Sequence, residues 1–294
     1  MLLSKELLQK VRLIEITTRK VVDDVLTGQY RSHFKGSGVQ FSEHRPYVPG
    51  DDVRHIDWRV SARSRDPQIK KYDEERELIV FLVVDVSGSE NFGSQGKLKS
   101  EIVAEIGGML AYAATHTGDR VGVLMFAGEV EYIVPPKKGR KHVLRLIRDL
   151  LAYSPKTKGT DLEGALEAAD RIMKHRGIIF ILSDFIAEGY SRQLMRLASK
   201  HDVVAVQIKD QRESDIPDVG QLLMCNPETG EEVLVDTGSY QFRKWFDEYR
   251  SRVEADSKAT VRTGVERLQI VTEEDYTDTV VRFFRARSRR RKLR

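Results

Sequence analysis

The chain has 294 residues, of which 40% are hydrophobic and 32% are charged, and its formal net charge is +4. A chain of this length and composition can bury one large core, or one core with an appended module. A single cysteine, Cys225, excludes an internal disulfide and suits a reducing compartment, and we expect it to be a buried, small apolar side chain. No stretch approaches a membrane span of about 18 apolar residues, and the N-terminus lacks the apolar segment of a signal peptide, so we predict a cytoplasmic protein without a membrane span.

The N-terminal part of the chain combines a helical pattern with a segment rich in Gly, Pro and charged residues. Apolar residues recur at helical spacing from Leu7 to Val25, which predicts a helix. The sequence PGDD at 49–52 then predicts a turn, because Pro fixes φ and Gly permits a positive φ. The run RPYVPGDDVRHIDWRVSAR, which ends at Arg63, places Asp and Arg side chains densely around Trp58. We interpret it as an ion-pair lattice that clamps the segment to the following domain with Trp58 as a buried anchor; a partner-facing surface is the alternative.

From Leu78 onward, apolar runs of strand length alternate with helical patterns. Strands are predicted at 78–84, 120–126, 129–134, 177–183 and 202–208, and helices near 97–116, 139–152, 161–175 and 190–200. Only Ala127 and Gly128 separate the second and third strands, which indicates a hairpin with an antiparallel edge strand. This alternation predicts an α/β fold, in which a doubly wound, mostly parallel sheet is flanked by helices and preceded by an N-terminal extension.

Beyond residue 210 the pattern is weaker. We predict a hairpin at 226–237, helices at 239–256 and 273–285, and a short strand at 268–271, and we assign them to completion of the same sheet. The chain then divides into an N-terminal helix and charged segment (1–77), a sheet domain with a C-terminal elaboration (78–281) and a basic tail (282–294). The tail holds eight Lys or Arg and no acid. Such endings can bind nucleic acid, anionic lipid or an acidic partner, and we favour the alternative of a solvated, disordered terminus.

Acidic and hydroxyl side chains follow two of the predicted buried strands and precede one helix. Asp85, Ser87 and Ser89 end the run LIVFLVVDVSGS, Asp184 ends GIIFILSD, and Thr160 opens GTDLEGALEAADRIM. Because ligands of open α/β sheets bind beyond the carboxyl ends of the strands, we expect all five at one rim. Oxygen ligands with few negative charges suit Mg²⁺ or Mn²⁺ and leave the ion electrophilic toward an outside carboxylate. Asp, Ser and Thr also cap helices, which is the alternative for each residue taken alone.

These motifs resemble those of known families. DVSGS, GDRVGVLMF at 118–126, GTDLEGAL and ILSD resemble the von Willebrand factor A domain with its metal-ion-dependent adhesion site, over about residues 78–210. Upstream, FSEHRPYVPGDDVRHIDWRVSAR followed by KKYDEERE resembles the signature of the bacterial family of unknown function DUF58, whose members are typically encoded beside MoxR-type AAA+ ATPases. Many relatives have Met where this chain has Glu90, and Glu where it has Gln40. Glu90 would place a third acid near the ion and reduce its electrophilicity.

The residues and the resemblance together predict a non-enzymatic adaptor that binds Mg²⁺ and engages a MoxR-type AAA+ ATPase and a client protein. No small-molecule substrate is expected, because GxGxxG is absent and GSQGKLKS at 93–100 lacks the spacing of a phosphate-binding loop. The best enzymatic alternative is a magnesium-dependent phosphotransferase, but such enzymes usually carry a second acid where this chain has Ser87. A nucleic-acid-binding module is a further alternative that rests on the basic tail alone, so nucleic acid is not expected as the main partner.

Overall fold

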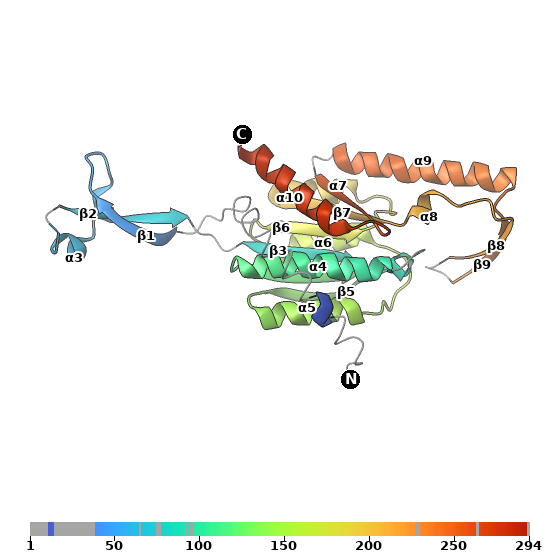
Figure 1. The fold of residues 1–294 in the computed structure, drawn as a ribbon, viewed down its shortest axis with the longest axis horizontal. Coiled ribbons are helices and arrows are strands. Elements are labelled where there is room, and N and C mark those ends of the chain that lie inside the picture. Colours follow the sequence, from blue (N-terminus) through green and yellow to red (C-terminus); the bar gives the residue numbers. More distant parts are fainter. Residues whose placement is uncertain are drawn as a thin grey trace.

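A six-stranded sheet forms the centre of the molecule (Figure 1). The computed structural model describes residues 11–14, 39–64, 66–74, 78–91, 93, 97–226, 230–262 and 265–292. The strands follow the order β10-β7-β6-β3-β4-β5, and each neighbouring pair is parallel except β4 with β5. The predicted α/β fold with a mostly parallel sheet and an antiparallel edge hairpin is confirmed.

The central strands are apolar along their length because helices cover both faces of the sheet. Successive side chains of β3 point to opposite faces, so Leu82 and Val84 belong to one core cluster, whereas Phe81 and Val83 belong to the other. The strands of the sheet are β3 (Ile79–Asp85), β4 (Arg120–Phe126), β5 (Val130–Lys137), β6 (Ile178–Ser183), β7 (Asp202–Lys209) and β10 (Glu266–Val271).

Helices pack on the two faces in separate groups. The first core cluster receives apolar side chains from α4 (Lys99–His116), α5 (Arg140–Ala152) and α10 (Tyr276–Lys292), and the second from α6 (Leu162–Ile172) and α7 (Ser191–Lys200). After β7 the chain forms the single turn α8 (Gln211–Ser214), and α9 (Tyr240–Arg262) contacts α7. Of the helix predicted at 7–25, residues 11–14 are helical and Ile14 is buried in the first cluster; the remainder lies outside the described residues.

The order of the strands places two loops side by side. β3 lies between β4 and β6, and the chain leaves β3 through α4 to β4 on one side but leaves β6 through α7 to β7 on the other. The loops that follow β3 and β6 therefore diverge from adjacent strand ends. Such a topological switch point is the usual position of a binding crevice in open α/β sheets.

The charged segment around Trp58 does not pack as its sequence predicted. It forms a small unit, the β1–β2 module, made of β1 (Val39–Pro46), the 3₁₀ turn η2 (Val53–His55), α3 (Trp58–Ser61) and β2 (Gln68–Glu74). In Figure 1 this module projects from the sheet on the side opposite to β8 (Gln221–Cys225) and β9 (Glu232–Asp236). Trp58 is 69% exposed, so the buried-anchor interpretation is wrong. Ile69 of β2, at 4% exposure, occupies the buried position of the module instead.

A C-terminal hairpin is present, but its first strand lies before the predicted range of 226–237, and the hairpin is not part of the central sheet. β8 (Gln221–Cys225) and β9 (Glu232–Asp236) pair antiparallel in a sheet of their own, whereas β10 pairs with β7 and completes the central sheet as expected. The assignment of the hairpin to the same sheet is therefore wrong, because β10 occupies the edge of β7. Cys225 ends β8 and is exposed, which corrects the expectation of a buried side chain.

The basic tail is helical as far as the structure describes it. α10 continues to Lys292, and Arg287 within it is 6% exposed, with ion pairs to Asp202 and, at 2.9 Å, to Glu266. The expectation of a disordered terminus is wrong over this range, because a buried charge pair ties the helix to β7 and β10. Among the described residues, no helix is long and apolar enough to cross a membrane.

Candidate metal centre

Asp85 is fixed at the carboxyl end of β3 by hydrogen bonds to both of its carboxylate oxygens. The side chain is 1% exposed. The Ser87 backbone N–H donates to Oδ1 at 3.0 Å, and the Ser183 hydroxyl donates to Oδ2 at 2.8 Å. The hydroxyls of Ser87 and Ser89 lie 3.2 Å apart. The end of β3 and the loop after it therefore bring together three of the predicted oxygen ligands.

Asp184 follows β6, the neighbour of β3 in the sheet, and is also buried. Its Oδ1 accepts from the Ile186 N–H at 3.0 Å, and its backbone carbonyl accepts from the Gln207 side chain at 2.9 Å. The next residue, Phe185, has φ of 60°, in the left-handed region that bulky side chains rarely adopt. Such strain costs about 1–3 kcal/mol and persists where surrounding contacts enforce it, often at functional sites. This turn holds the Asp184 carboxylate toward Asp85.

Glu90 completes a buried acidic triad. It belongs to the 3₁₀ turn η3 (Gly88–Asn91), and carboxylate oxygens of Asp85, Glu90 and Asp184 lie within 4.8 Å of one another. Neither oxygen of Glu90 has a hydrogen-bond partner among the described residues, although the side chain is 1% exposed. Burial and the nearby Asp184 carboxylate raise the pKa of Asp85 to about 7, and burial raises the pKa of Glu90 well above its usual value. An unsatisfied buried carboxylate beside two others favours the binding of a cation.

A lysine that sequence analysis missed lies against the triad. Lys99 is the first residue of α4, and its fully buried Nζ donates to Asp184 Oδ2 at 3.1 Å and to Glu213 Oε1 at 2.6 Å. Burial lowers the pKa of Lys99, but the surrounding carboxylates outweigh this effect and the pKa is raised. The sequence did contain a signal for Lys99, because this lysine lies one turn before Ile102 on the buried side of α4. No comparable signal in the sequence pointed to Glu213, which lies in α8.

Thr160 precedes α6 on a loop that is tied to the edge hairpin. Glu131 of β5 accepts hydrogen bonds from the Lys156 N–H (2.9 Å), the Thr157 N–H (2.7 Å), the Thr157 hydroxyl (2.6 Å) and the Tyr153 hydroxyl (2.9 Å). Partial burial raises the pKa of Glu131, but these bonds outweigh it and lower that pKa to about 2. Gly128 of the edge hairpin also lies close to this loop. A Cβ at Gly128 would lie 2.2 Å from the backbone oxygen of residue 158, so the approach of the two segments requires a glycine.

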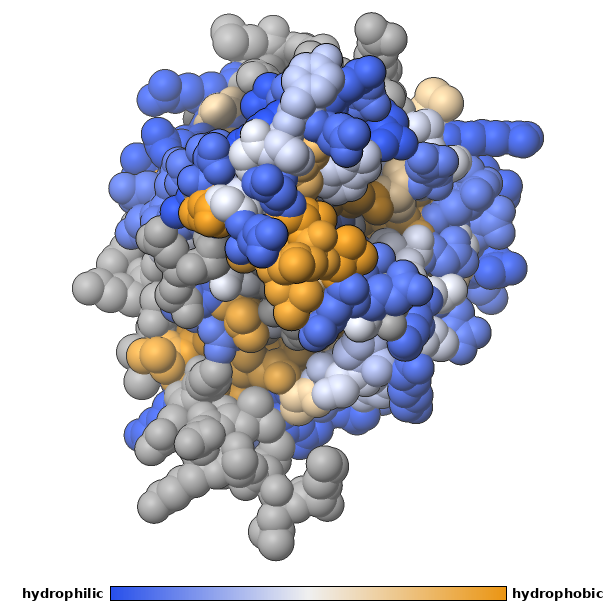
Figure 2. All heavy atoms as spheres, turned by 90° about the vertical axis from the view of Figure 1, so that its right-hand side faces the viewer, coloured by the Kyte–Doolittle hydropathy of each residue, from blue (hydrophilic) through white to orange (hydrophobic). Residues whose placement is uncertain are grey.

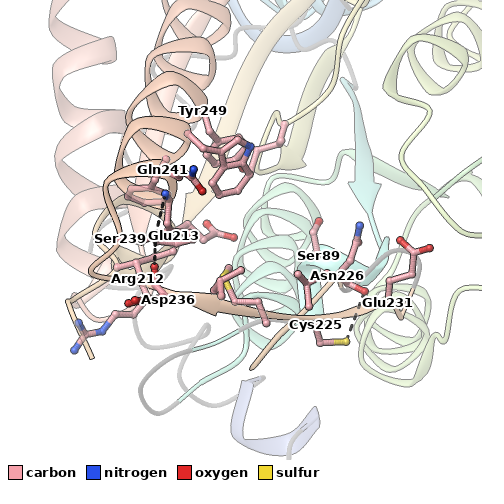
Figure 3. A pocket seen from close by; sticks show the side chains of 18 of the residues that line it. Ser89, Arg212, Glu213, Cys225, Asn226, Glu231, Asp236, Ser239, Gln241 and Tyr249 are labelled. Atoms are coloured by element: carbon pink, nitrogen blue, oxygen red, sulfur yellow. Dashed lines mark hydrogen bonds between the residues drawn. The ribbon is translucent and has the colours of Figure 1, made fainter. Parts of the chain in front are cut away.

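Thr160, Ser89 and Asp184 line one cavity of about 940 Å³, in which Glu213 also takes part. Most of its apolar lining comes from α9 and the β8–β9 hairpin, with Ile186 and Ile216 in addition. From α9 project Phe242, Trp245, Phe246 and Tyr249, spaced so that they fall on one helix face, and from the hairpin project Met224, Val233 and Val235. Figure 3 shows Tyr249 on α9 and Cys225 on β8 on different sides of this cavity. Figure 2 views the same end of the molecule and shows apolar side chains gathered at its centre.

The structure thus brings together Asp85, Ser87 and Asp184, which are buried, and the partly buried Ser89. Thr160 lines the same cavity as Ser89 and Asp184. All the ligand atoms are carboxylate or hydroxyl oxygens, which hard cations prefer. The triad with the unsatisfied Glu90 fits a divalent cation, which these residues would hold at the carboxyl edge of the sheet. The assignment of the five individual ligands stays a prediction.

Comparison with known proteins agrees with this architecture. Residues 43–256 match the family model described as "Protein of unknown function DUF58". The chain belongs to the DUF58 family. An uncharacterised protein of Mycobacterium tuberculosis, Rv1480, is 32% identical over 285 residues, which cover 95% of this DUF58 chain and 89% of the relative.

Solved structures align with part of this chain at low sequence identity. An aerotolerance-related membrane protein from Bacteroides fragilis aligns with a TM-score of 0.50 at 16% identity, over 72% of this chain and 99% of that chain. The VWA domain of SpRpn10 aligns with a TM-score of 0.41 at 10% identity, over 70% of this chain and 94% of that chain. At such an identity, the alignment with the Bacteroides fragilis protein concerns the fold and not the function.

Proposed function

We propose that this DUF58 protein is a non-enzymatic adaptor that binds a protein partner through a divalent cation, Mg²⁺ or Mn²⁺. The predicted ligands are Asp85, Ser87, Ser89, Thr160 and Asp184. The observation that supports the proposal most is the pair of unsatisfied Glu90 oxygens within the buried acidic triad. A cation would supply the positive charge that balances these carboxylates.

The cavity supports a role in recognition. An ion held by neutral hydroxyls and few carboxylates can accept a carboxylate from an Asp or Glu of the partner. Glu90 lowers the net positive charge at the ion, so this single contact would be weakened. The aromatic face of α9 and the β8–β9 hairpin, which line the same cavity, would then contribute apolar contact area around the partner's acid.

The proposed partner is a MoxR-type AAA+ ATPase, and the adaptor would help it to mature or remodel a client protein. This part of the proposal rests on the resemblance of the Phe41–Arg63 segment to the DUF58 signature. We place the complex in the cytoplasm, since an exposed single thiol such as Cys225 suits a reducing compartment.

No chemical step is proposed for Asp85. Both of its oxygens accept hydrogen bonds, from Ser87 and Ser183, and the side chain is buried. A phosphotransferase would need Asp85 as a nucleophile and would usually place an acid at the position of Ser87. No small-molecule substrate is proposed either, because GxGxxG is absent and GSQGKLKS at 93–100 lacks the spacing of a phosphate-binding loop.

The metal part of the proposal is tested by titration of the purified protein with Mg²⁺ and Mn²⁺, followed by calorimetry and thermal unfolding. We expect both ions to bind, Ca²⁺ to bind less well, and Asp85→Ala or Ser87→Ala to weaken binding strongly. Asp170→Ala is a matched control, because this carboxylate pairs with Lys200 away from the triad. An Asp85→Ala variant that binds the ions as well as the wild type does would refute the site.

The partner is tested with the purified MoxR-type ATPase of the same organism in Mg²⁺ and in chelator. Removal of the ion, or Thr160→Ala, should weaken the complex well over tenfold, because breaking one buried charged contact at an interface commonly costs about 2–5 kcal/mol. Equal binding in chelator would mean that the cation has at most a structural role.

A further inference from the structure

Lys99 places a positive charge beside the carboxylates that would hold a metal ion. Its ammonium group bonds to Asp184, a predicted metal ligand, and to Glu213, which belongs to the cavity wall. The side chain of Lys99 is fully buried, and that of Glu213 is 22% exposed. The cluster therefore carries its own counter-cation, with two alternative carboxylates within reach.

The hydrogen bonds at Asp184 indicate which of its oxygens is contested. Oδ1 accepts from the Ile186 backbone, whereas Oδ2 accepts from Lys99. An ion that coordinates Asp184 through Oδ2 meets the lysine at that atom. Two like charges at one buried carboxylate repel strongly, because the low dielectric of the interior screens them little.

We infer that Lys99 is an internal competitor of the divalent ion: it holds Asp184 in the metal-free protein and moves its ammonium group entirely to Glu213 when the ion binds. This inference rests on the proposed metal site. The shorter bond, 2.6 Å, is already the one to Glu213, and an ammonium group on a flexible stem can keep one partner while it releases the other.

Competition from Lys99 makes tight binding of the ion depend more strongly on the partner. Displacement of Lys99 opposes ion binding, so the ion alone binds less tightly than its carboxylates would allow. A partner carboxylate that joins the ion adds to its binding free energy, and each ligand then raises the affinity of the other by the same factor. The same lysine stabilises the carboxylates while no ion is bound, since buried charges without a partner are costly.

The first test is Mn²⁺ binding to Lys99→Met, measured by electron paramagnetic resonance and calorimetry at two salt concentrations. We expect binding about tenfold tighter than in the wild type, within the usual range of coupling between sites, and little sensitivity to salt because the site is buried. Lys97→Met is the matched control: it removes the same charge two residues away, where the lysine pairs with Glu105, and its Mn²⁺ affinity should stay at the wild-type value.

The second test separates displacement from a plain charge effect. Glu213→Gln removes the alternative partner of Lys99, so Mn²⁺ should bind about tenfold more weakly in this variant. In a Lys99→Met background the same change should have little effect, because no lysine remains to be relocated. Simple electrostatics would instead weaken binding by the same factor in both backgrounds, and that result would overturn the inference.

The outcomes distinguish this inference from the proposed function. Equal Mn²⁺ affinity in the wild type and in Lys99→Met overturns the inference alone. Binding to Lys99→Met but not to the wild type supports the competition and refutes the metal-dependent function. No binding to either protein refutes both. If Lys99→Met does not fold, Glu213→Gln in the native background still tests the inference, because unchanged or tighter Mn²⁺ binding would contradict displacement.

Discussion

Two regions of this protein combine Asp with Lys or Arg, and they differ in burial. At the carboxyl edge of the sheet, Lys99 and Asp184 pair in the interior. In the β1–β2 module, Arg45 donates two bonds of 2.7 Å to Asp51 at the surface, and the side chain of Arg45 is 40% exposed. The same residue types therefore have different energetic roles, because water screens the second pair and not the first.

The two regions also differ in how far apart along the chain their partners are. Arg45 and Asp51 are 6 positions apart, and His44 and Asp57 are 13 positions apart. Asp57 accepts from His44 and also bonds Lys70, and these contacts lower the pKa of Asp57 to about 2. Lys99, in contrast, is 85 positions from Asp184. The module organises its charges locally, whereas the buried cluster exists only once the sheet has formed.

The largest expected effect comes from the core of the sheet domain. Phe284 of α10 is 2% exposed and packs edge-on against Phe180 of β6. Phe284→Ala should lower the free energy of unfolding by about 3–5 kcal/mol through loss of burial and creation of a cavity, as measured by urea denaturation. Arg285→Ala, at the exposed neighbouring position, is the control. A loss below about 1 kcal/mol would indicate that α10 does not pack on the sheet.

The second-largest effect on stability is expected when the buried ion pairs of Lys99 are removed in the absence of metal. Lys99→Met keeps much of the stem but leaves Asp184 and Glu213 without their cation. In chelator the unfolding free energy should fall by about 3 kcal/mol, the lower end of the range for broken buried pairs, because Glu213 retains contact with solvent. Urea denaturation measures it. A variant as stable as the wild type would show that these carboxylates do not need the lysine.

A smaller effect is expected at the loop that carries Thr160. Glu131→Gln weakens the bonds that hold residues 153–157 and should cost about 1 kcal/mol at pH 7, since the side chain is only partly buried. The folded pKa of Glu131 lies below its unfolded value, so its contribution is complete above about pH 4.5 and is lost as the pH falls toward about 2. Unfolding curves of both proteins should therefore converge over this window. Glu129→Gln, exposed on the same hairpin, should show no such convergence.

The smallest effect is expected in the β1–β2 module. Because Trp58 is 69% exposed, Trp58→Ala should change the unfolding free energy by no more than about 0.5 kcal/mol. Thermal unfolding beside Phe284→Ala gives a direct comparison of two aromatic truncations. A loss above about 2 kcal/mol would restore the buried-anchor interpretation of the sequence.

Sequence patterns alone determined the elements of the sheet domain and the place of its candidate site. The continuous apolar runs before Asp85 and Asp184 could be read as strands buried on both faces, and parallel strands bring their carboxyl ends to one edge. The conclusions about the strands and their shared edge need only the period of the pattern and the order of the elements. The expectation that Glu90 lies near the ion came instead from the family resemblance, in which many relatives have Met at this position, and Glu90 does lie in the acidic triad.

Tertiary structure decided the partners of those residues. Glu213 meets Lys99 across 114 positions, and nothing in the local sequence of either one specifies the other. The sequence did not predict the burial of Trp58 and Cys225 correctly either. Both belong to residue types that are often found in protein cores, but they are exposed, because the module and the hairpin that carry them lie outside the central sheet. Arg287 shows the reverse, a charge from a basic tail that the fold buries between Asp202 and Glu266. Local patterns fix which face of an element is apolar, but only packing fixes what that face meets.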